Sequence, residues 1–172
     1  MMGGESEYAK VAAIAFLPLA IGVCTGDTLA QSAGDLVGTW TLVTSAAEKD
    51  GKRIDQFGPD ARGMMTLDSQ GHFMITIIGA DLPRFASNNR NSGTAEENKA
   101  VVQYSIARFG TYSFSSEDKT ITFQLERNTF PNWSGTTQKR LVTSATEDEL
   151  AYANTGTTSA GGTAITTWKR AR

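Results

Sequence analysis

Short segments in which apolar and polar side chains alternate residue by residue follow one another from Leu36 to the end of the chain. This period-two alternation, with β-branched and aromatic residues separated by Gly, Asp, Asn and Ser, is typical of antiparallel strands that bury one face. It predicts an all-β domain. The predicted strands lie at residues 37–46, 62–68, 72–79, 108–116, 119–128, 137–145, 149–154 and 163–170, with a further short strand at 52–55.

Turn residues at hairpin distance join several of these strands. They are Asp50-Gly51, Asp68-Ser69-Gln70-Gly71, Ser116-Glu117-Asp118-Lys119 and Glu147-Asp148, and such residues favour tight connections between antiparallel neighbours. About eight strands is the usual number for a barrel that can hold one small ligand. We therefore predict a single up-and-down antiparallel β-barrel of about eight strands.

One segment breaks the strand pattern. Residues 80–93 have the composition of a loop, and Thr94 with Glu97 forms a capping box that predicts one short helix at about 94–106. We expect the helix to lie over the barrel mouth or its outer wall, with one face formed by residues at three- and four-residue spacing: Ala100, Val101, Tyr104 and Ala107.

The first thirty residues are interpreted as a signal peptide. Val11 to Val23 is an uncharged run too short to span a bilayer as a helix, and Thr28-Leu29-Ala30 after it is a small-residue cleavage site. The expected domains are therefore a signal peptide at residues 1–30 and a mature barrel at residues 31–172. A periplasmic or secreted location follows, without a membrane span in the mature protein.

Two details qualify this interpretation. Glu5 and Glu7 outnumber Lys10 before the apolar run, where signal peptides are usually positive. A lipoprotein alternative would use Cys24, but Val23 before it is a poor fit to the small residue expected there. Removal of Cys24 leaves a mature chain without cysteine, which suits an oxidising compartment.

Composition excludes several other functions. Sixteen Lys+Arg against 18 Asp+Glu, without a basic run, argue against nucleic acid as a partner. One cysteine and one histidine cannot form a Cys/His zinc site, and no Gly-x-Ser-x-Gly elbow, Walker or dinucleotide glycine pattern is present. We therefore expect no metal and no cofactor.

Motifs in order along the chain resemble those of the bacterial and fungal lipocalin-like domain family. They are Leu36-Val37-Gly38-Thr39-Trp40-Thr41-Leu42, Phe57-Gly58-Pro59-Asp60-Ala61-Arg62-Gly63, Asp68-Ser69-Gln70-Gly71-His72, Pro83-Arg84-Phe85-Ala86-Ser87, Arg90, Phe109-Gly110-Thr111-Tyr112 and Phe130-Pro131-Asn132-Trp133-Ser134-Gly135-Thr136, then Gln138 and Arg140. The resemblance covers residues 36–170 and implies a calycin-type β-barrel, without implying an activity. It also implies that Trp40 lies at the closed end of the barrel beneath a basic side chain of the last strand, Arg170 or Lys169.

Three polar residues before the predicted helix are candidates for ligand contacts. His72 has the only side chain with an unperturbed pKa near neutrality, and it faces solvent if the apolar face of its strand is the packed one. Arg84 and Arg90 lie in a long loop and would close over an anionic head group such as a carboxylate. The alternative is that the two arginines fix the loop to Asp81 or to backbone carbonyls.

Further candidates lie in the second half of the chain. Pro131 predicts a bend that places Asn132 and Trp133 at a barrel rim. Gln138 and Arg140 share one face of a strand, and Arg140 forms either a buried pair with Glu126 or part of a polar pocket floor. Three tyrosines would either offer hydroxyl groups to a ligand or only pack in the core: Tyr104, Tyr112 and Tyr152.

These features favour a barrel that binds a small hydrophobic or amphipathic molecule, neutral or anionic, in its central cavity. The alternative is a cofactor-independent isomerase, cyclase or lyase in the same cavity, with His72 or Glu126 as the base and Arg140 or a tyrosine stabilising negative charge. A third interpretation is a filled barrel that serves as an interaction module. Convergence of His72, Glu126 and Arg140 on one point would favour the enzyme.

Overall fold

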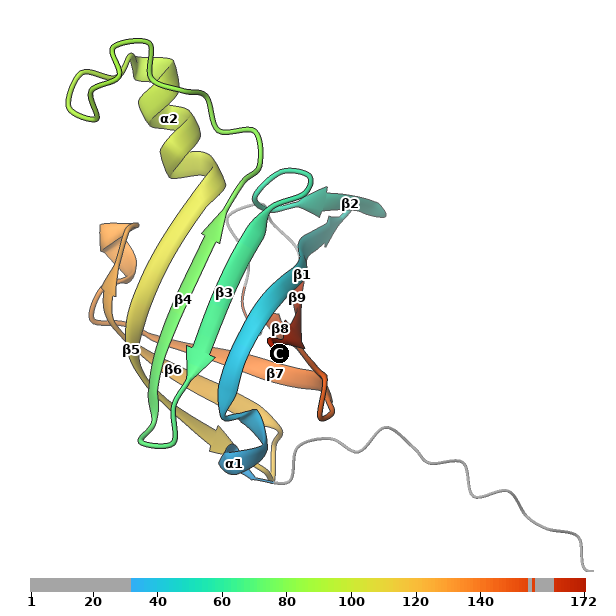
Figure 1. Ribbon diagram of the computed structural model, residues 1–172. Helices are drawn as coiled ribbons and strands as arrows, with labels where there is room; N and C mark the ends of the chain where they lie inside the picture. Colours follow the sequence, from blue (N-terminus) through green and yellow to red (C-terminus); the bar gives the residue numbers. More distant parts are fainter. Residues whose placement is uncertain (1–31, 155, 157–162) are drawn as a thin grey trace, which may run out of the picture.

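The computed structural model describes residues 32–154, 156 and 163–172, and the described residues form a closed antiparallel barrel (Figure 1). Eight strands follow the order β1-β3-β4-β5-β6-β7-β8-β9, and β9 pairs back with β1. The predicted signal peptide, residues 1–30, lies outside the described residues. The strands are β1 (Gly38–Lys49), β2 (Lys52–Asp55), β3 (Arg62–Leu67), β4 (His72–Ile78), β5 (Ser105–Ser115), β6 (Thr120–Asn128), β7 (Thr137–Ala145), β8 (Glu149–Asn154) and β9 (Thr163–Arg170).

Alternation along each strand gives the barrel a buried interior, as the sequence pattern predicts. In β4, Phe73, Ile75 and Ile77 are buried while Met74 and Ile78 are exposed. Burying a large apolar side chain of this kind contributes about 1.5–3 kcal/mol. The closed all-β barrel is therefore confirmed, and its inward-facing apolar residues are its core.

A β-bulge at Val43 changes which positions of β1 point inward. Leu42 pairs with Trp168 and Thr44 pairs with Thr167, so Val43 has no partner in β9. A bulge shifts the alternation by one residue. The buried residues are therefore Trp40 before the bulge and Ser45 and Ala47 after it.

One end of the barrel, called here the α1 end, is covered by the short helix α1 (Ala33–Leu36). Leu36 is buried, and its carbonyl accepts a hydrogen bond of 3.0 Å from Trp40 Nε1. The guanidinium of Arg170 lies over the Trp40 ring, 4.1 Å from its centroid. The expected basic cover is therefore confirmed as Arg170, while Lys169 is exposed.

The opposite end, called here the α2 end, carries helix α2 (Ala95–Tyr104), which projects beyond β4 and β5 (Figure 1). The predicted capping box is present: Glu97 N donates to Thr94 Oγ1 and Thr94 N donates to Glu97 Oε2. The helix ends before residue 106 because Ser105 has an extended backbone and begins β5. Ala107 was expected on the helix, and this expectation is wrong since it pairs with Thr76 in the sheet.

Helix α2 has no buried residue, and its last turn is fixed to the barrel by a hydrogen bond of 2.8 Å from Gly79 N to Tyr104 O. The 3-10 helix η1 (Pro131–Trp133) supplies the bend predicted at Pro131. Within the described part of the chain, no helix has the length and apolar character needed to cross a membrane.

Candidate functional site

The interior of the barrel is mostly apolar and also contains a group of inward-facing polar side chains, and two sets of residues are called here the apolar wall and the polar wall. The apolar wall consists of buried side chains on β3, β4 and β6: Met65, Ile75, Ile77, Phe123 and Leu125. The polar wall consists of inward-facing residues on β5, β7, β8, β9 and β1: Arg108, Gln138, Arg140, Tyr152, Thr166 and Ser45. Polar side chains are costly in a barrel interior unless they are paired or bind something.

Two arginines of the polar wall share one acceptor. Arg108 Nη1 donates to Gln138 Oε1 at 3.0 Å, and Arg140 Nη2 donates to the same oxygen at 2.5 Å. Arg140 also donates from Nη1 to the backbone carbonyl of Lys139, at 2.8 Å. Gln138 therefore holds the two guanidinium groups close to each other.

Burial disfavours the charge on both arginines. It lowers the pKa of Arg108 below its ordinary value, and the neighbouring Tyr152 hydroxyl partly offsets this effect. Burial, together with the positive charge of Arg108, lowers the pKa of Arg140 to about 10. A guanidinium group stays protonated in proteins at neutral pH, so two positive charges lie close together inside the barrel.

No carboxylate balances these charges within the described residues. The ion pairs there are Arg53–Asp55, His72–Asp68 and Arg172–Asp148, all between exposed side chains. Arg140 is only 8% exposed, so water compensates its charge poorly. A buried cation pair without an acid is unusual and indicates a place for an anion.

Several buried donors of this region also lack a hydrogen-bond partner among the described residues. They are Arg108 Nε, Arg140 Nε and Asn128 Nδ2, and Asn128 lies directly opposite Arg108 in the β5–β6 pair. The buried Tyr152 hydroxyl makes no hydrogen bond of normal geometry, although it lies close enough to Arg108 to favour its charged form. The region therefore contains more donors than acceptors.

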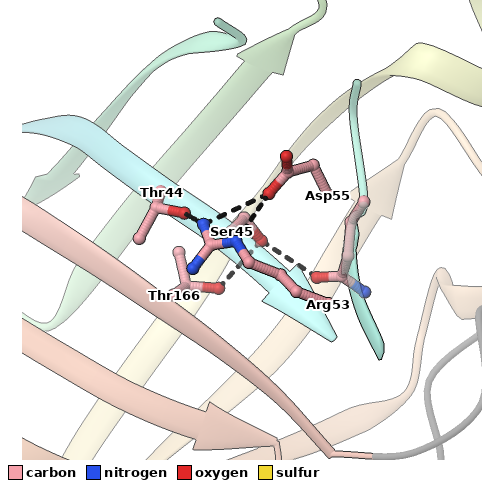
Figure 2. Close-up of polar contacts among 6 residues, drawn as sticks. Thr44, Ser45, Arg53, Asp55 and Thr166 are labelled. Carbon is pink, nitrogen blue, oxygen red and sulfur yellow. Dashed lines mark hydrogen bonds and ion pairs between the residues drawn. The ribbon is translucent and has the colours of Figure 1, made fainter. Parts of the chain in front are cut away.

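A second polar group continues the wall across β9 and β1. Thr166 is the register partner of both Tyr152 and Ser45. Ser45 Oγ donates to Gln56 Oε1 at 2.9 Å, so its contact of 3.1 Å with Thr166 Oγ1 is donated by Thr166 (Figure 2). This group is internally satisfied and joins the two strands that close the barrel.

An exposed cluster lies beside this group. Arg53 Nε donates to Asp55 Oδ1 at 3.2 Å, and Arg53 Nη2 donates to Thr44 Oγ1 (Figure 2). Both members of the ion pair are solvated, so it contributes little to stability. The cluster fixes β2 against β1 and belongs to the outer surface.

Three of the predicted site residues lie inside the barrel. Gln138 and Arg140 come together as described, with Arg108 as their partner. Tyr112 is also buried, but its hydroxyl donates to Asp68 O at 2.9 Å at the far end of β5 from α2, and burial raises its pKa. Its hydroxyl is therefore engaged in the structure of the barrel.

Two of the predicted residues lie outside it. His72 is exposed, and its Nδ1 lies 3.0 Å from Asp68 Oδ2. Glu126 is exposed in a bulge of β6, because the register passes from Arg127 to Leu125 opposite β5. The hypothesis of a buried Arg140–Glu126 pair is therefore wrong, and His72, Glu126 and Arg140 do not converge.

The other candidates lie near the ends of strands. Arg84 and Arg90 are exposed in the segment that precedes α2. Asn132 is exposed in η1, and the half-buried Trp133 packs against the core, with its ring centroid 5.2 Å from that of Phe130. The structure brings none of these four residues into the arginine pair's hydrogen bonds.

Sequence reasoning missed Arg108 although the predicted strand at residues 108–116 contained it, because the two faces of that strand were not worked out. With β5 starting at Ser105, Arg108 shares the inward face with Ile106 and Tyr112. An arginine at even spacing from Tyr112 and Phe114 was the signal that could have identified it. Asn128 was missed as well, and Tyr152 was considered only as one of three hydroxyl groups.

Nothing in the described part of the chain assembles three or more His, Cys, Asp or Glu side chains that could hold a metal ion. The family described as lipocalin-like domain matches residues 37–171. No curated protein matches the chain.

Among solved structures, a redesigned β-barrel is 17% identical with a TM-score of 0.44, covering 84% of this chain and 99% of its own. A de novo designed fluorescence-activating β-barrel is 14% identical with a TM-score of 0.43, covering 83% and 99%. A redesigned β-barrel, mFAP1, bound to DFHBI, is 19% identical with a TM-score of 0.41, covering 82% and 100%.

Proposed function

This chain belongs to the lipocalin-like domain family, and we propose that its barrel binds one small amphipathic molecule. The apolar part of the molecule lies against the apolar wall, and its polar part lies against Arg108 and Arg140. The observation that carries this proposal is the pair of Arg108 and Arg140 inside the barrel, on the two strands that flank the buried apolar residues of β6. A purely structural barrel would be more stable with an apolar interior throughout.

A catalytic role has less support. The base in such a mechanism was expected to be His72 or Glu126, and both side chains are exposed on the outside of the barrel. The arginine pair holds and orients negative charge, which binding alone requires. Binding is therefore the function that this arrangement favours.

Native mass spectrometry of the protein purified from its own host tests this proposal. We expect one small molecule per chain that is lost on denaturation. A complementary titration uses a fluorescent polyene fatty acid and the corresponding alcohol, whose emission rises when they leave water. A bare polypeptide mass in repeated preparations, together with no binding of either probe, would contradict the proposal and favour a filled barrel.

A further inference from the structure

We propose that the buried pair of Arg108 and Arg140 is the receptor for a carboxylate head group of the bound molecule. This inference rests on the proposed function and specifies the ligand class, a long-chain or similarly apolar carboxylic acid. It places the anion inside the barrel, away from the exposed loop arginines that the sequence had suggested for that role.

The two guanidinium groups share an acceptor that carries no charge. Gln138 Oε1 is a neutral acceptor, and it already receives bonds from both guanidinium groups, at 3.0 and 2.5 Å. A neutral amide oxygen cannot compensate two cations. A negative charge beside the pair would do so, and a ligand is the source of negative charge that the described residues do not supply.

Hydrogen-bond donors around the pair outnumber the acceptors. Four buried groups with donor capacity in this region lack a normal hydrogen bond: Arg108 Nε, Arg140 Nε, Asn128 Nδ2 and the Tyr152 hydroxyl. One further unpartnered buried atom, Trp168 Nε1, belongs to a residue paired with Leu42 toward the α1 end. An ionised carboxylate only accepts hydrogen bonds, so it supplies the acceptors that this region lacks.

The pair lies on the two strands that flank β6, which has a buried apolar face. Arg108 lies near the start of β5, at the α2 end, and Arg140 lies opposite Ile121 in the β6–β7 pair. Ile121, Phe123 and Leu125 are buried on the neighbouring strand. An acid bound to the arginines therefore has apolar side chains next to its head group, as an amphipathic ligand requires.

The test compares a polyene fatty acid with its methyl ester, which has the same chain and no charge. Both probes are titrated into the full chain by fluorescence at neutral pH. We expect the acid to bind at least about tenfold more tightly than the ester, because charge-assisted bonds to buried arginine are strong and specific. An alkyl phosphate of equal chain length is expected to compete less well than the alkyl carboxylate.

Two variants test whether Arg108 and Arg140 cause the preference for the acid over the ester. Arg108→Met and Arg140→Met retain side-chain volume and remove one charge each, and each is expected to weaken acid binding by about tenfold to a hundredfold. Binding of the ester is expected to change by less than about threefold. Arg127→Met is the matched control, since Arg127 is an exposed arginine on β6, and it should affect neither probe. Circular dichroism confirms that each variant is folded.

The outcomes are distinct. Equal binding of acid and ester would overturn the carboxylate receptor and leave the proposed binding function standing. Failure of both probes to bind would overturn the proposed function and the receptor together. The preference for the acid could also survive in both Arg108→Met and Arg140→Met and be lost in Arg84→Met/Arg90→Met. This result would overturn the assignment, because it would place the carboxylate-binding site in the loop before α2. Stronger competition by the phosphate would overturn the choice of a carboxylate.

Discussion

Arg170 covers Trp40, with its guanidinium carbon 4.1 Å from the centroid of the ring. The same guanidinium donates to the backbone carbonyls of Val37 and Asp35, at 2.7 and 2.9 Å, and to that of Glu147. These contacts join the last strand to α1 and to the turn between β7 and β8. We expect Arg170→Ala to lower the free energy of unfolding by about 2–3 kcal/mol, as measured by urea denaturation.

Lys169→Ala is the control for this prediction. Lys169 is the adjacent residue of β9 and is exposed, so its truncation should change stability by less than about 0.5 kcal/mol. Equal effects of the two substitutions would show that the cover over Trp40 does not stabilise the α1 end.

Gly110 allows β5 and β6 to approach each other closely. A Cβ atom built at this residue would lie 1.9 Å from the backbone oxygen of Gln124, where nothing can move without breaking the strand pair. We expect Gly110→Ala to destabilise the barrel by more than about 2 kcal/mol, measured by thermal and urea unfolding. Gly156→Ala is the control, because a Cβ there meets nothing within 4 Å. An unchanged melting temperature for Gly110→Ala would contradict the close approach.

The carboxylate of Glu97 ties the segment before α2 to the helix. Its two oxygens accept hydrogen bonds of 2.8 Å from Ala86 N and Thr94 N, and these bonds lower the pKa of Glu97 below 4.5. The stabilising effect is therefore present above the ordinary pKa and is lost as the pH falls through the lowered one. We expect the Ala86 and Thr94 amide resonances to shift together, with a midpoint below 4.5, in an NMR titration. In Glu97→Gln this shared transition should vanish.

The fold could be predicted from local sequence signals. Alternation in residues such as Phe73, Ile75 and Ile77 identified an inward face, and turn residues such as Asp68 and Gly71 identified the hairpins. These signals depend on near neighbours in the chain, so they survive without knowledge of the tertiary structure. Bulges do not give such a signal, and for this reason the inward position of Asn128, beyond the bulge at Glu126, could not be predicted.

The site depends on contacts between distant residues. Arg108 and Gln138 are thirty positions apart, and only barrel closure determines which inward-facing polar residues meet. Sequence reasoning identified Gln138 and Arg140 as partners on one face, but it paired Arg140 with a carboxylate that faces outward. The predicted strand at residues 108–116 contained Arg108, but no neighbouring residue in the sequence indicates that its side chain meets Gln138 inside the barrel.

The charge on Arg140 has a stability cost in the ligand-free protein. The side chain is 8% exposed and has no acidic partner among the described residues. Replacement of such a charge by an apolar side chain of similar volume removes the desolvation cost. We expect Arg140→Met to raise the free energy of unfolding of the ligand-free chain by about 1–3 kcal/mol, as measured by urea denaturation. A loss of stability in this variant would show that the guanidinium stabilises the barrel without a ligand.

The gain from Arg140→Met should depend on pH in a defined direction. The pKa of Arg140 is about 10 in the folded chain, below its ordinary value. The unfolded chain therefore binds more protons at this residue above pH 10, and the stability of the wild-type chain rises with pH in that range relative to the variant. The difference in unfolding free energy between the two proteins should be constant at neutral pH and should narrow above pH 10.

Arg108→Met provides the second comparison, because the charge of Arg108 is one cause of the lowered pKa of Arg140. In the Arg108→Met background, the difference in unfolding free energy caused by Arg140→Met should begin to narrow at a higher pH. Paired urea titrations up to about pH 11 measure both differences, and subtraction removes the contributions of lysines and tyrosines common to each pair. A difference that stays constant across the whole range would show that the pKa of Arg140 is not lowered in the folded chain. Narrowing that begins at the same pH in both backgrounds would show that the two guanidinium groups are not electrostatically coupled.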